Sequence, residues 1–287
     1  MCLLVVIRLG KLLETSTLSD PQLNDVRTLA ENCNRYESLD YLRPNQEMTS
    51  HGQHFLFYEA DKLAGFLTLL GMPEFEAHVI VDPQHRRKGI GRSLINAAKE
   101  SCKRMHLREF LLISEEKSTS GKAFAEAIGA EYRYSEYRMK LERKPPKPSQ
   151  DAIHLRRVDD RDLDLLVQLI AKSFNDPIEA HFDRMKQDIR SPIHRFYVAN
   201  LAEEPVGCIG VVTPDQRAYV IAFGVLPEYR SRGYGRQMLT HTINGLVAEN
   251  WKEVLIEVRT DNRNALSLYS SCGFVENTSY KYYAITS

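Results

Sequence analysis

The chain has 287 residues, which is enough for two domains of ordinary size. Its apolar fraction of 43% and charged fraction of 26% are those of an average folded protein, so the composition excludes disordered, collagen-like and disulfide-scaffold classes. Lysine plus arginine equals aspartate plus glutamate at 38 each, and this balance predicts no general attraction to nucleic acid or to an anionic membrane surface.

The first segment, from Met1 to Ile7, is apolar but too short to cross a bilayer, and it lacks the features of a signal peptide. We expect a β-strand there. His51 and His54 form an H-x-x-H pair without further ligands at metal-site spacing, so we expect no metal site. The cysteines are far apart and indicate reduced thiols in a cytoplasmic protein. They are Cys2, Cys33, Cys102, Cys208 and Cys272.

Two segments of the chain repeat each other. Residues 81 to 95 read VDPQHRRKGIGRSLI, and residues 225 to 239 read VLPEYRSRGYGRQML, at an offset of 144. The same offset links Gly129 with Gly273, near the end of each copy. Upstream, Gly65 and Gly207 are 142 residues apart, which we interpret as a loop that is two residues longer in the second copy. The repeat predicts two copies of one domain.

A proline-rich segment separates the two copies. It contains Pro145, Pro146 and Pro148, which remove amide donors and favour extended geometry. We interpret residues 145–150 as a linker. The predicted domains are therefore residues 1–144 and 151–287.

The second copy shows the predicted elements most clearly. A strand at 152–157 leads through Asp159 and Asp160, which favour helix N-caps, into a helix with leucines at helical spacing. The elements that follow are a hairpin (196–199 and 206–212), a strand at 219–225, a helix from Gly233, a strand at 254–258, a helix at 263–272 and a strand at 280–285. This order predicts an α/β (α+β) fold, in which each copy has a mixed, mostly antiparallel twisted sheet flanked by helices.

In each copy, a strand and a proline precede the pattern Arg-x-x-Gly-x-Gly, which opens a helix. Glycine lets the turn adopt unusual φ values, and the first helical amides, which lack partners within the helix, point towards an anion. Nearby arginine and lysine side chains add positive charge. Nucleoside triphosphate and dinucleotide loops are disfavoured, because the chain has no G-x-x-x-x-G-K-S/T and no third glycine. The pattern therefore predicts a phosphate-binding loop in both copies.

These loops resemble the pyrophosphate loop of the GNAT superfamily of acyl-CoA-dependent N-acyltransferases, Q/R-x-x-G-x-G/A after a strand. The resemblance covers nearly the whole chain, and the tandem arrangement is similar to that of mycothiol synthase. It implies acetyl-CoA as co-substrate, bound by backbone groups at Val81 and Val225 and by the two loops. The loop residues are Arg86, Arg87, Lys88, Gly89, Ile90, Gly91 and Arg92 in the first copy, and Arg230, Ser231, Arg232, Gly233, Tyr234, Gly235 and Arg236 in the second.

The segment from Leu255 to Phe274 is similar to ribosomal-protein N-terminal acetyltransferases, in which a strand glutamate is the base and a helix tyrosine is the acid. The matching residues are Glu257 and Tyr269. An ammonium must lose a proton before its nitrogen attacks a thioester, and a donor assists the departing thiolate, so one carboxylate and one phenol meet both needs. Asn262 and Asn264 complete the expected cofactor contacts.

The first copy lacks the proposed proton-transfer groups. At the offset of 144, the catalytic pair becomes Ile113 and Ala125, and both asparagines become serines. Glu115 and Glu116 lie nearby and offer an alternative base at the end of the strand. We expect a first domain that is degenerate in catalysis and supports the fold, the substrate cleft or a second CoA.

The sequence thus predicts an N-acetyltransferase whose second domain moves an acetyl group from acetyl-CoA to a primary amine by direct attack. The alternative is a non-catalytic acyl-CoA sensor or scaffold, which the retention of Glu257 and Tyr269 disfavours. The expected acceptor is a small-molecule amine or a peptide N-terminus, and we expect no nucleic-acid or membrane partner. Polyamines, amino sugars, thiol-linked amines and peptide N-termini stay open, because residues 174–195 carry mixed charge.

Overall fold

The computed structural model describes residues 3–7, 10–44, 52–71, 75–143 and 152–287. Two compact units make up the chain. Unit 1 consists of Met1–Ser135 with Ser279–Ser287, and unit 2 of Glu136–Thr278. Cys2, His51 and the expected linker at 145–150 lie outside the described residues.

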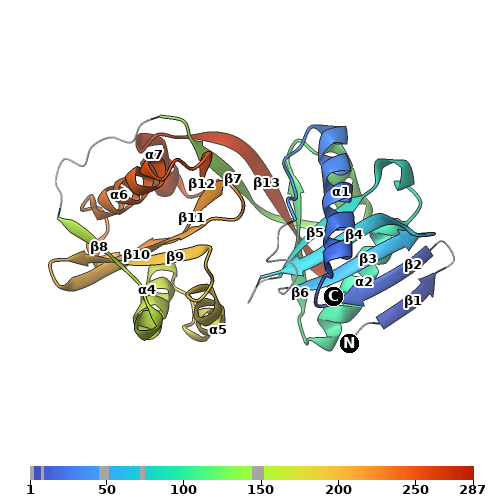
Figure 1. Cartoon of the computed structure of the whole chain (residues 1–287), viewed down its shortest axis with the longest axis horizontal. Helices are drawn as coiled ribbons and strands as arrows, with labels where there is room; N and C mark the ends of the chain where they lie inside the picture. Colours follow the sequence, from blue (N-terminus) through green and yellow to red (C-terminus); the bar gives the residue numbers. More distant parts are fainter. Residues whose placement is uncertain (1–2, 8–9, 45–51, 72–74, 144–151) are drawn as a thin grey trace. The chain divides into compact units, whose positions relative to one another are not determined.

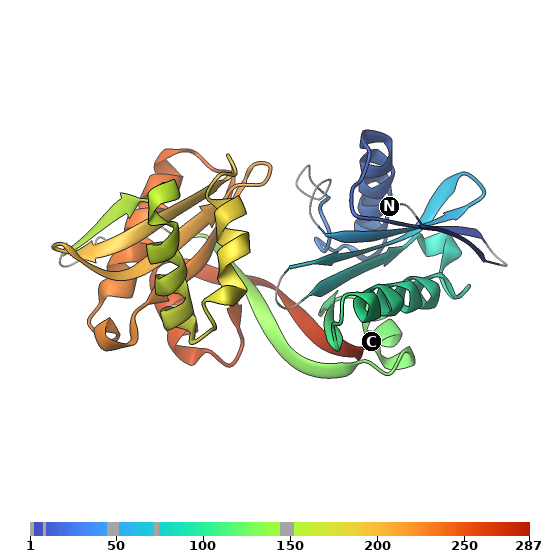
Figure 2. The ribbon, with the colours of Figure 1, turned by 90° about the horizontal axis from the view of Figure 1, so that it is seen from below.

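Unit 1 is a twisted sheet with helices on both faces (Figure 1, Figure 2). The strand order is β1-β2-β3-β4-β5-β6-β13, and neighbouring strands are antiparallel except for β5 and β6. Its strands are β1 Leu3–Ile7, β2 Gly10–Thr15, β3 Gln53–Glu59, β4 Lys62–Leu70, β5 Glu76–Val81, β6 Glu109–Glu115 and β13 Phe274–Thr286, of which the last begins in unit 2. Its helical elements are α1 Asp20–Glu37, η2 Pro83–His85, α2 Ile90–Arg104 and α3 Thr119–Ala127.

Two separate cores hold the helices of unit 1 to the sheet. Ser19 caps the N-terminus of α1, because its side chain accepts a hydrogen bond from the amide of Gln22. The helix buries Leu23, Val26 and Leu29 against one face of the sheet. α2 buries a stripe at helical spacing against the other face, where it contacts β3, β4 and β5. The sheet therefore separates the α1 face from the α2 face.

Unit 2 repeats this design with the order β7-β12-β11-β10-β9-β8, in which β11 and β12 are parallel. Helices α4 and α5 cover one face and helices α6 and α7 the other (Figure 1). Its strands are β7 Glu131–Leu141, which begins in unit 1, β8 Ile153–Arg157, β9 His194–Leu201, β10 Glu204–Val212, β11 Arg217–Val225 and β12 Glu253–Arg259. Its helical elements are η3 Asp160–Asp162, α4 Leu163–Phe174, α5 Glu179–Asp188, η4 Pro227–Tyr229, α6 Tyr234–Ala248 and α7 Arg263–Ser271.

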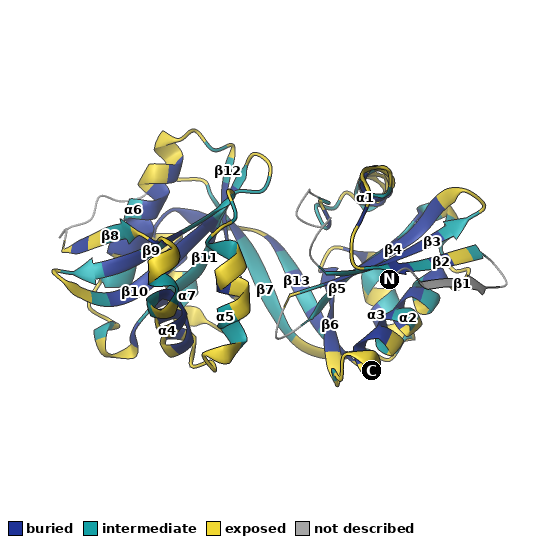
Figure 3. Cartoon of the chain, turned by 60° about the horizontal axis from the view of Figure 1, so that its bottom comes forward, coloured by how far each residue is buried: buried dark blue, intermediate teal, exposed yellow. Residues whose placement is uncertain are grey.

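The central strands carry the burial in both units. β4 and β10 are buried along almost their whole length, whereas α5 has exposed residues along one side and buries only Met185 (Figure 3). Burial on both faces explains the continuous apolar runs in β4 and β10, because apolar and polar residues do not alternate in a strand that is covered on both faces. The expected elements of the second copy and the strand near Met1 are confirmed, as is the mixed, mostly antiparallel α/β fold class.

The units exchange the strands that end the two repeat copies. β7 pairs with β12, with Arg138 opposite Glu257, and β13 pairs with β6, with Tyr280 opposite Glu115. Both copies end in a strand of the same kind, so the repeat does not indicate which sheet each strand completes. The continuous ranges 1–144 and 151–287 therefore describe the repeat, whereas the compact units differ from them in the last strands.

The structure shows the surroundings of the histidine and the cysteines that the sequence analysis singled out. His54 is buried, with its Nδ1 2.9 Å from Thr68 Oγ1 and its ring stacked on Phe66. Cys33, Cys102, Cys208 and Cys272 are buried free thiols. Within the described ranges, no helix is long and apolar enough to span a membrane.

Candidate functional site

The two glycine loops have the same backbone conformation. A short 3-10 turn at Pro83–His85 or Pro227–Tyr229 leads to a residue in the left-handed region, with φ of 65° at Arg87 and 62° at Ser231. The first glycine of each loop is also left-handed and directly precedes a 15-residue helix. Left-handed residues beside a helix start make successive amides converge, which creates an anion-binding concavity.

The two glycines of each loop serve different purposes. Gly89 and Gly233 have φ of 89° and 83°, and a Cβ at either position would meet nothing within 4 Å. Their requirement is therefore conformational, and the space above them is open to a ligand. A Cβ at Gly91 would lie 3.0 Å from the Phe124 ring, so that glycine allows the start of α2 to approach α3 closely.

The first arginine of each loop fastens the loop to the strand before it. Arg86 Nε donates to the Val81 carbonyl at 3.2 Å, and Arg230 Nε donates to the Val225 carbonyl at 3.0 Å. Arg230 also donates to the Ser173 carbonyl of α4 at 2.6 Å. These two guanidinium groups therefore position the ends of β5 and β11. Arg230 is exposed, and the other exposed basic side chains of the loops are Arg87, Lys88, Arg92, Arg232 and Arg236.

The parallel strands separate before they reach the loops. β5 pairs with β6 only at Glu76 and Ala77, although β5 continues to Val81. β11 pairs with β12 up to Val220, although β11 continues to Val225. Each unit thus opens a gap between its parallel strands beside the loop.

A β-bulge distinguishes the opened strand of unit 2. The pairing of β10 with β11 shifts by one residue between Cys208 and Gly210, and Ala222 has φ of 45°. The pairing of β4 with β5 shows no such shift. One of the two residues that the second copy gains therefore lies inside a strand, so the expectation that only a loop changed length is corrected. Bulges bend a strand and redirect its groups, and they are common beside active sites.

A cavity of about 450 Å³ adjoins the loop of unit 1. The end of α1 and the segment after it, the separated ends of β5 and β6, and the starts of α2 and α3 form its walls. The expected cofactor residues in its lining are Val81, Arg86, Arg87, Gly89, Ile90, Gly91 and Arg92. Lys88 is exposed and stands outside this lining.

Glu37, at the end of α1, is one of the acids that line this cavity. Its carboxylate forms an ion pair with Arg86 and accepts a hydrogen bond of 2.7 Å from Ser118 Oγ. Burial opposes its ionisation, but hydrogen bonds from Ser120, Ser118 and Arg86 outweigh burial and hold the pKa of Glu37 below its ordinary value of 4.5. Ser118 also caps α3, the role that Asn262 has in α7.

Unit 2 places larger side chains at the equivalent positions. Phe223 replaces Val79 and Tyr234 replaces Ile90, both of which line the cavity of unit 1. Phe223 also packs against Tyr269, with ring centroids 6.0 Å apart. The surroundings of the second loop are therefore more aromatic than those of the first.

Tyr269 is buried beside the second loop. Its side chain packs between Phe223 and Phe274, and the residue is 7% exposed. Burial raises the pKa of its phenol above the ordinary value of 10.0, so the hydroxyl keeps its proton across the physiological range. Leu268, its neighbour in α7, lies 3.5 Å from the position of a Cβ on Gly235, which places α7 against the loop.

Glu257 lies on the opposite face of the sheet from Tyr269. Val254, Ile256 and Val258 point into the core that contains Tyr269, so the alternation of β12 directs Glu257 to the α4 face. Its carboxylate is 2.8 Å from Arg138 Nε, across the β7–β12 pair. Arg138 was not among the expected site residues, because it belongs to the first copy and 119 positions separate it from Glu257.

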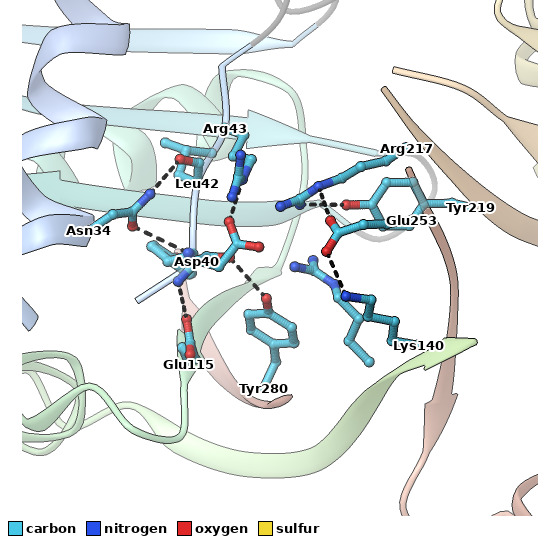
Figure 4. Close-up of polar contacts among 12 residues, drawn as sticks. Asn34, Asp40, Leu42, Arg43, Glu115, Lys140, Arg217, Tyr219, Glu253 and Tyr280 are labelled. Carbon is cyan, nitrogen blue, oxygen red and sulfur yellow. Dashed lines mark hydrogen bonds and ion pairs between the residues drawn. The ribbon is translucent and has the colours of Figure 1, made fainter. Parts of the chain in front are cut away.

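A second charged group continues this face of unit 2. Glu253 accepts from Arg217 Nε at 2.8 Å and lies 3.1 Å from Lys140 Nζ, and Figure 4 shows it between them. Arg138 and Lys140 of β7 thus form ion pairs with the two acidic residues of β12. Asn262 accepts a hydrogen bond of 3.1 Å from the Ala265 amide, and Asn264 is exposed in the first turn of α7.

The family model that matches the chain describes the acetyltransferase (GNAT) family, over residues 23–130 and 163–274. The sequence is 28% identical to a mycothiol acetyltransferase of Thermomonospora curvata over 279 residues, which cover 90% of this chain and 91% of that protein. It is 35% identical to the N-alpha-acetyltransferase RimI of Mycobacterium tuberculosis over 92 residues, which are 31% of this chain and 56% of that protein.

Two solved structures resemble the whole chain. A GCN5-related N-acetyltransferase from Sphaerobacter thermophilus aligns with a TM-score of 0.76 at 17% identity, over 96% of this chain and 95% of that one. A tandem GNAT protein from the clavulanic acid biosynthesis pathway aligns with a TM-score of 0.70 at 17% identity, over 96% and 98%. The tandem fold is thus shared along the full length of these proteins.

Proposed function

The chain belongs to the acetyltransferase (GNAT) family, and from this premise we propose that unit 2 transfers an acetyl group from acetyl-CoA to a primary amine, with Glu257 as general base and Tyr269 as general acid. The observation that carries the proposal is the position of these two residues on opposite faces of the sheet, next to the gap between β11 and β12. In this arrangement, Glu257 acts on the amine from one face of the sheet, and Tyr269 acts on the departing thiolate from the other.

The residues of the second loop fit the co-substrate. Gly233 leaves open space above the helix start, and the left-handed Ser231 and Gly233 direct backbone amides to a common point. Amides at a helix N-terminus bind a pyrophosphate. Exposed Arg232 and Arg236 add positive charge at that point. Acetyl-CoA supplies the activated acetyl thioester when it is bound.

Glu257 has the properties of a base at the acceptor side. It is 38% exposed by side chain on the α4 face, so an amine can reach it from solvent. The ion pair with Arg138 fixes its carboxylate in place. In the proposed reaction, Glu257 takes the proton from the ammonium, and the neutral nitrogen attacks the thioester carbon.

Tyr269 has the properties of an acid at the other side. Its raised pKa keeps the hydroxyl protonated until a thiolate forms beside it. The bulge at Ala222 bends the strand that borders the gap, which turns backbone groups of β11 towards the reacting carbonyl. Amide donors aimed at a developing oxyanion are among the strongest contributions to catalysis.

An acyl-CoA sensor is the second candidate function, and one observation favours it. The 450 Å³ cavity adjoins the loop of unit 1, where Ile113 and Ala125 stand at the positions of the proposed base and acid. Such a pocket suits binding of acyl-CoA without the residue pair proposed for catalysis in unit 2. The acceptor itself is proposed to be a small-molecule amine or a peptide N-terminus, as the names of the mycothiol acetyltransferase and N-alpha-acetyltransferase relatives suggest.

The test is release of CoA from acetyl-CoA across a panel of small amines and peptide N-termini, with wild type and Tyr269→Phe. We expect amine-dependent release that falls at least about tenfold in the variant. Tyr197→Phe is the matched control, because Tyr197 also packs partly buried against the unit 2 core and loses only a hydroxyl. Release that Tyr269→Phe leaves unchanged contradicts the role of Tyr269, and binding of acetyl-CoA without any release supports the sensor.

A further inference from the structure

The cavity of unit 1 reaches both faces of its sheet. On the α2 side it is lined by Gly91 of the loop and by Phe124 of α3, and on the α1 side by Asn34, Leu39 and Tyr41. These two sides belong to different cores, which the sheet separates. The cavity therefore passes through the gap where β5 and β6 part, and it connects the anion-binding loop with the face covered by α1.

Glu115 lines this cavity at the α1 side. It is the last residue of β6 and only 4% exposed. Its Oε2 accepts a hydrogen bond of 3.2 Å from the Asp40 amide, and Tyr280 of β13 donates to the Asp40 carbonyl (Figure 4). This contact with the segment after α1 helps to hold Glu115 at the cavity wall.

Glu115 lies on the same face of its sheet as Glu257 does in unit 2. Ile113 takes the place of Glu257 at the offset of 144. Glu115 is two residues further along the strand, and residues two apart in a strand point to the same face. Phe110 and Leu112 point to the α2 core, whereas Leu111 and Ile113 pack with Tyr41, which confirms the α1 side for Glu115.

We propose that unit 1 is a second acyl-transfer site, in which Glu115 is the general base for a compact primary amine. The inference goes beyond the reaction proposed for unit 2 and does not depend on it. It replaces the expectation of a catalytically degenerate first copy. The observation behind it is one continuous cavity that holds an anion-binding loop at one end and an oriented, buried carboxylate at the other.

The reaction proposed at Glu115 transfers an acyl group from the CoA sulfur to the nitrogen of the amine. The carboxylate takes one proton from the ammonium and later passes it to solvent. The neutral nitrogen forms a bond to the acyl carbon, and the bond from that carbon to the CoA sulfur breaks. The second proton lost by the nitrogen goes to the departing thiolate, so the products are an amide and CoA thiol.

The walls of the cavity define the class of acceptor. The carboxylate of Glu115 in the lining favours a cationic head group. The neighbouring wall is formed by Leu39, Ile113 and the Tyr41 ring, whose hydroxyl donates to the Ile113 carbonyl at 2.6 Å. A primary amine with a short apolar body matches one buried carboxylate among apolar side chains.

The experiment uses the full chain with unit 2 silenced by Glu257→Gln and Tyr269→Phe together. CoA release from acetyl-CoA is measured with a panel of short primary alkylamines and arylalkylamines. We expect amine-dependent release to persist in this background and to fall at least about 100-fold when Glu115→Gln is added. Glu109→Gln is the matched control, because Glu109 is a half-exposed glutamate on the same strand that pairs with Arg133.

Titration calorimetry with acetyl-CoA separates chemistry from folding and binding. Glu115→Gln is expected to bind as many acetyl-CoA molecules as its parent, because the amide oxygen still accepts from the Asp40 amide. If that variant does not fold, Glu115→Asp, which keeps the charge and withdraws it by one methylene, takes its place in both measurements. Release that survives at the parental rate, or an absence of amine-dependent release in the silenced background, overturns the proposal. Neither result bears on the reaction proposed for unit 2.

Discussion

The loops of units 1 and 2 agree in backbone and differ in side chains. Arg87 and Ser231 have nearly the same left-handed φ although one is a cation and the other a small hydroxyl residue. Ile90 and Tyr234 both open a 15-residue helix directly after a glycine. The comparison teaches that this anion cradle depends on glycine spacing and helix direction, whereas the side chains around it are adjusted for other tasks.

The regions beside the loops differ much more than the loops. Unit 2 has a bulge at Ala222, a half-exposed base candidate and a buried phenol, whereas unit 1 has a regular strand and a cavity of about 450 Å³. Glu115 and Glu257 lie on equivalent faces, yet the first contacts a backbone amide and the second an arginine. Two copies of one binding loop thus supply two different chemical surroundings.

Deletion of Ala222 tests the contribution of the bulge and is expected to have the largest effect. The deletion gives β11 the regular pairing of β5, so backbone donors at the gap are turned away from the reacting carbonyl. We expect amine-dependent release to fall about 100-fold, the size of effect seen when an oxyanion donor is lost. Binding of acetyl-CoA, measured by calorimetry, is expected to remain.

The control for the deletion is Ala222→Gly, which keeps the extra residue and adopts the φ of 45° without strain. This variant is expected to keep its activity. Equal activity of the deletion variant and Ala222→Gly, with both folded, would show that the bulge does not distinguish the two units.

Arg138→Gln sharpens the comparison of the two carboxylates. Loss of the guanidinium frees the Glu257 side chain to sample other rotamers, and misplacement of a base is expected to lower kcat about tenfold. Steady-state kinetics check this. Lys140→Gln is the control, because Lys140 makes the neighbouring ion pair with Glu253 across the same two strands. A similar loss in both variants would assign Arg138 a general role in the sheet.

Glu37→Gln tests how much the ionised Glu37 carboxylate, in the wall of the unit 1 cavity, contributes to the stability of the fold. The pKa of Glu37 is lowered in the folded state, so its ionised form stabilises the fold above its ordinary value of 4.5, and this contribution is lost as pH falls through the lower folded pKa. We expect the variant to melt below wild type at pH 7, by a difference that shrinks as the pH is lowered below 4.5. Thermal melts at pH 7 and at more acidic pH provide the measurement. A difference that grows with acid would contradict the assigned direction.

Gly245→Ala is expected to have the smallest effect. Gly245 lies inside α6, and a Cβ there would meet nothing within 4 Å. Alanine reduces the entropy lost on folding relative to glycine, so a gain of about 0.5–1 kcal/mol is expected. This corresponds to a rise in melting temperature of about 2 °C with no change in activity. A fall in melting temperature would indicate that the surroundings of α6 are not open.

The sequence predicts the fold well because both copies repeat the same spacing of apolar residues and turns. A strand, a proline and two glycines mark the loop, and the glycines at 89 and 233 adopt the left-handed φ that this pattern requires. Helical spacing from Gly233 onward predicts α6, and its buried face is the expected one. These features are local, so a single chain is enough to recognise them.

The features that sequence reasoning missed depend on contacts between distant segments. The gain of two residues before the second loop is visible, but only the pairing of β10 with β11 shows that one of them forms a bulge. Nothing local indicates that β7 brings Arg138 to Glu257, because an edge strand can complete either sheet. Glu115 is visible beside Ile113, but its burial at a cavity wall follows from the segment around Asp40.

The most direct measurement compares Gly233→Val with Gly89→Val in amine-dependent CoA release, using the amine that wild type acetylates fastest. A branched residue is strongly disfavoured at these φ values, and either change distorts one loop only. If unit 2 is the main site, Gly233→Val loses at least about 90% of the rate of CoA release, and Gly89→Val keeps most of that rate. The opposite result, with both variants folded, would contradict the assignment of the principal reaction to unit 2.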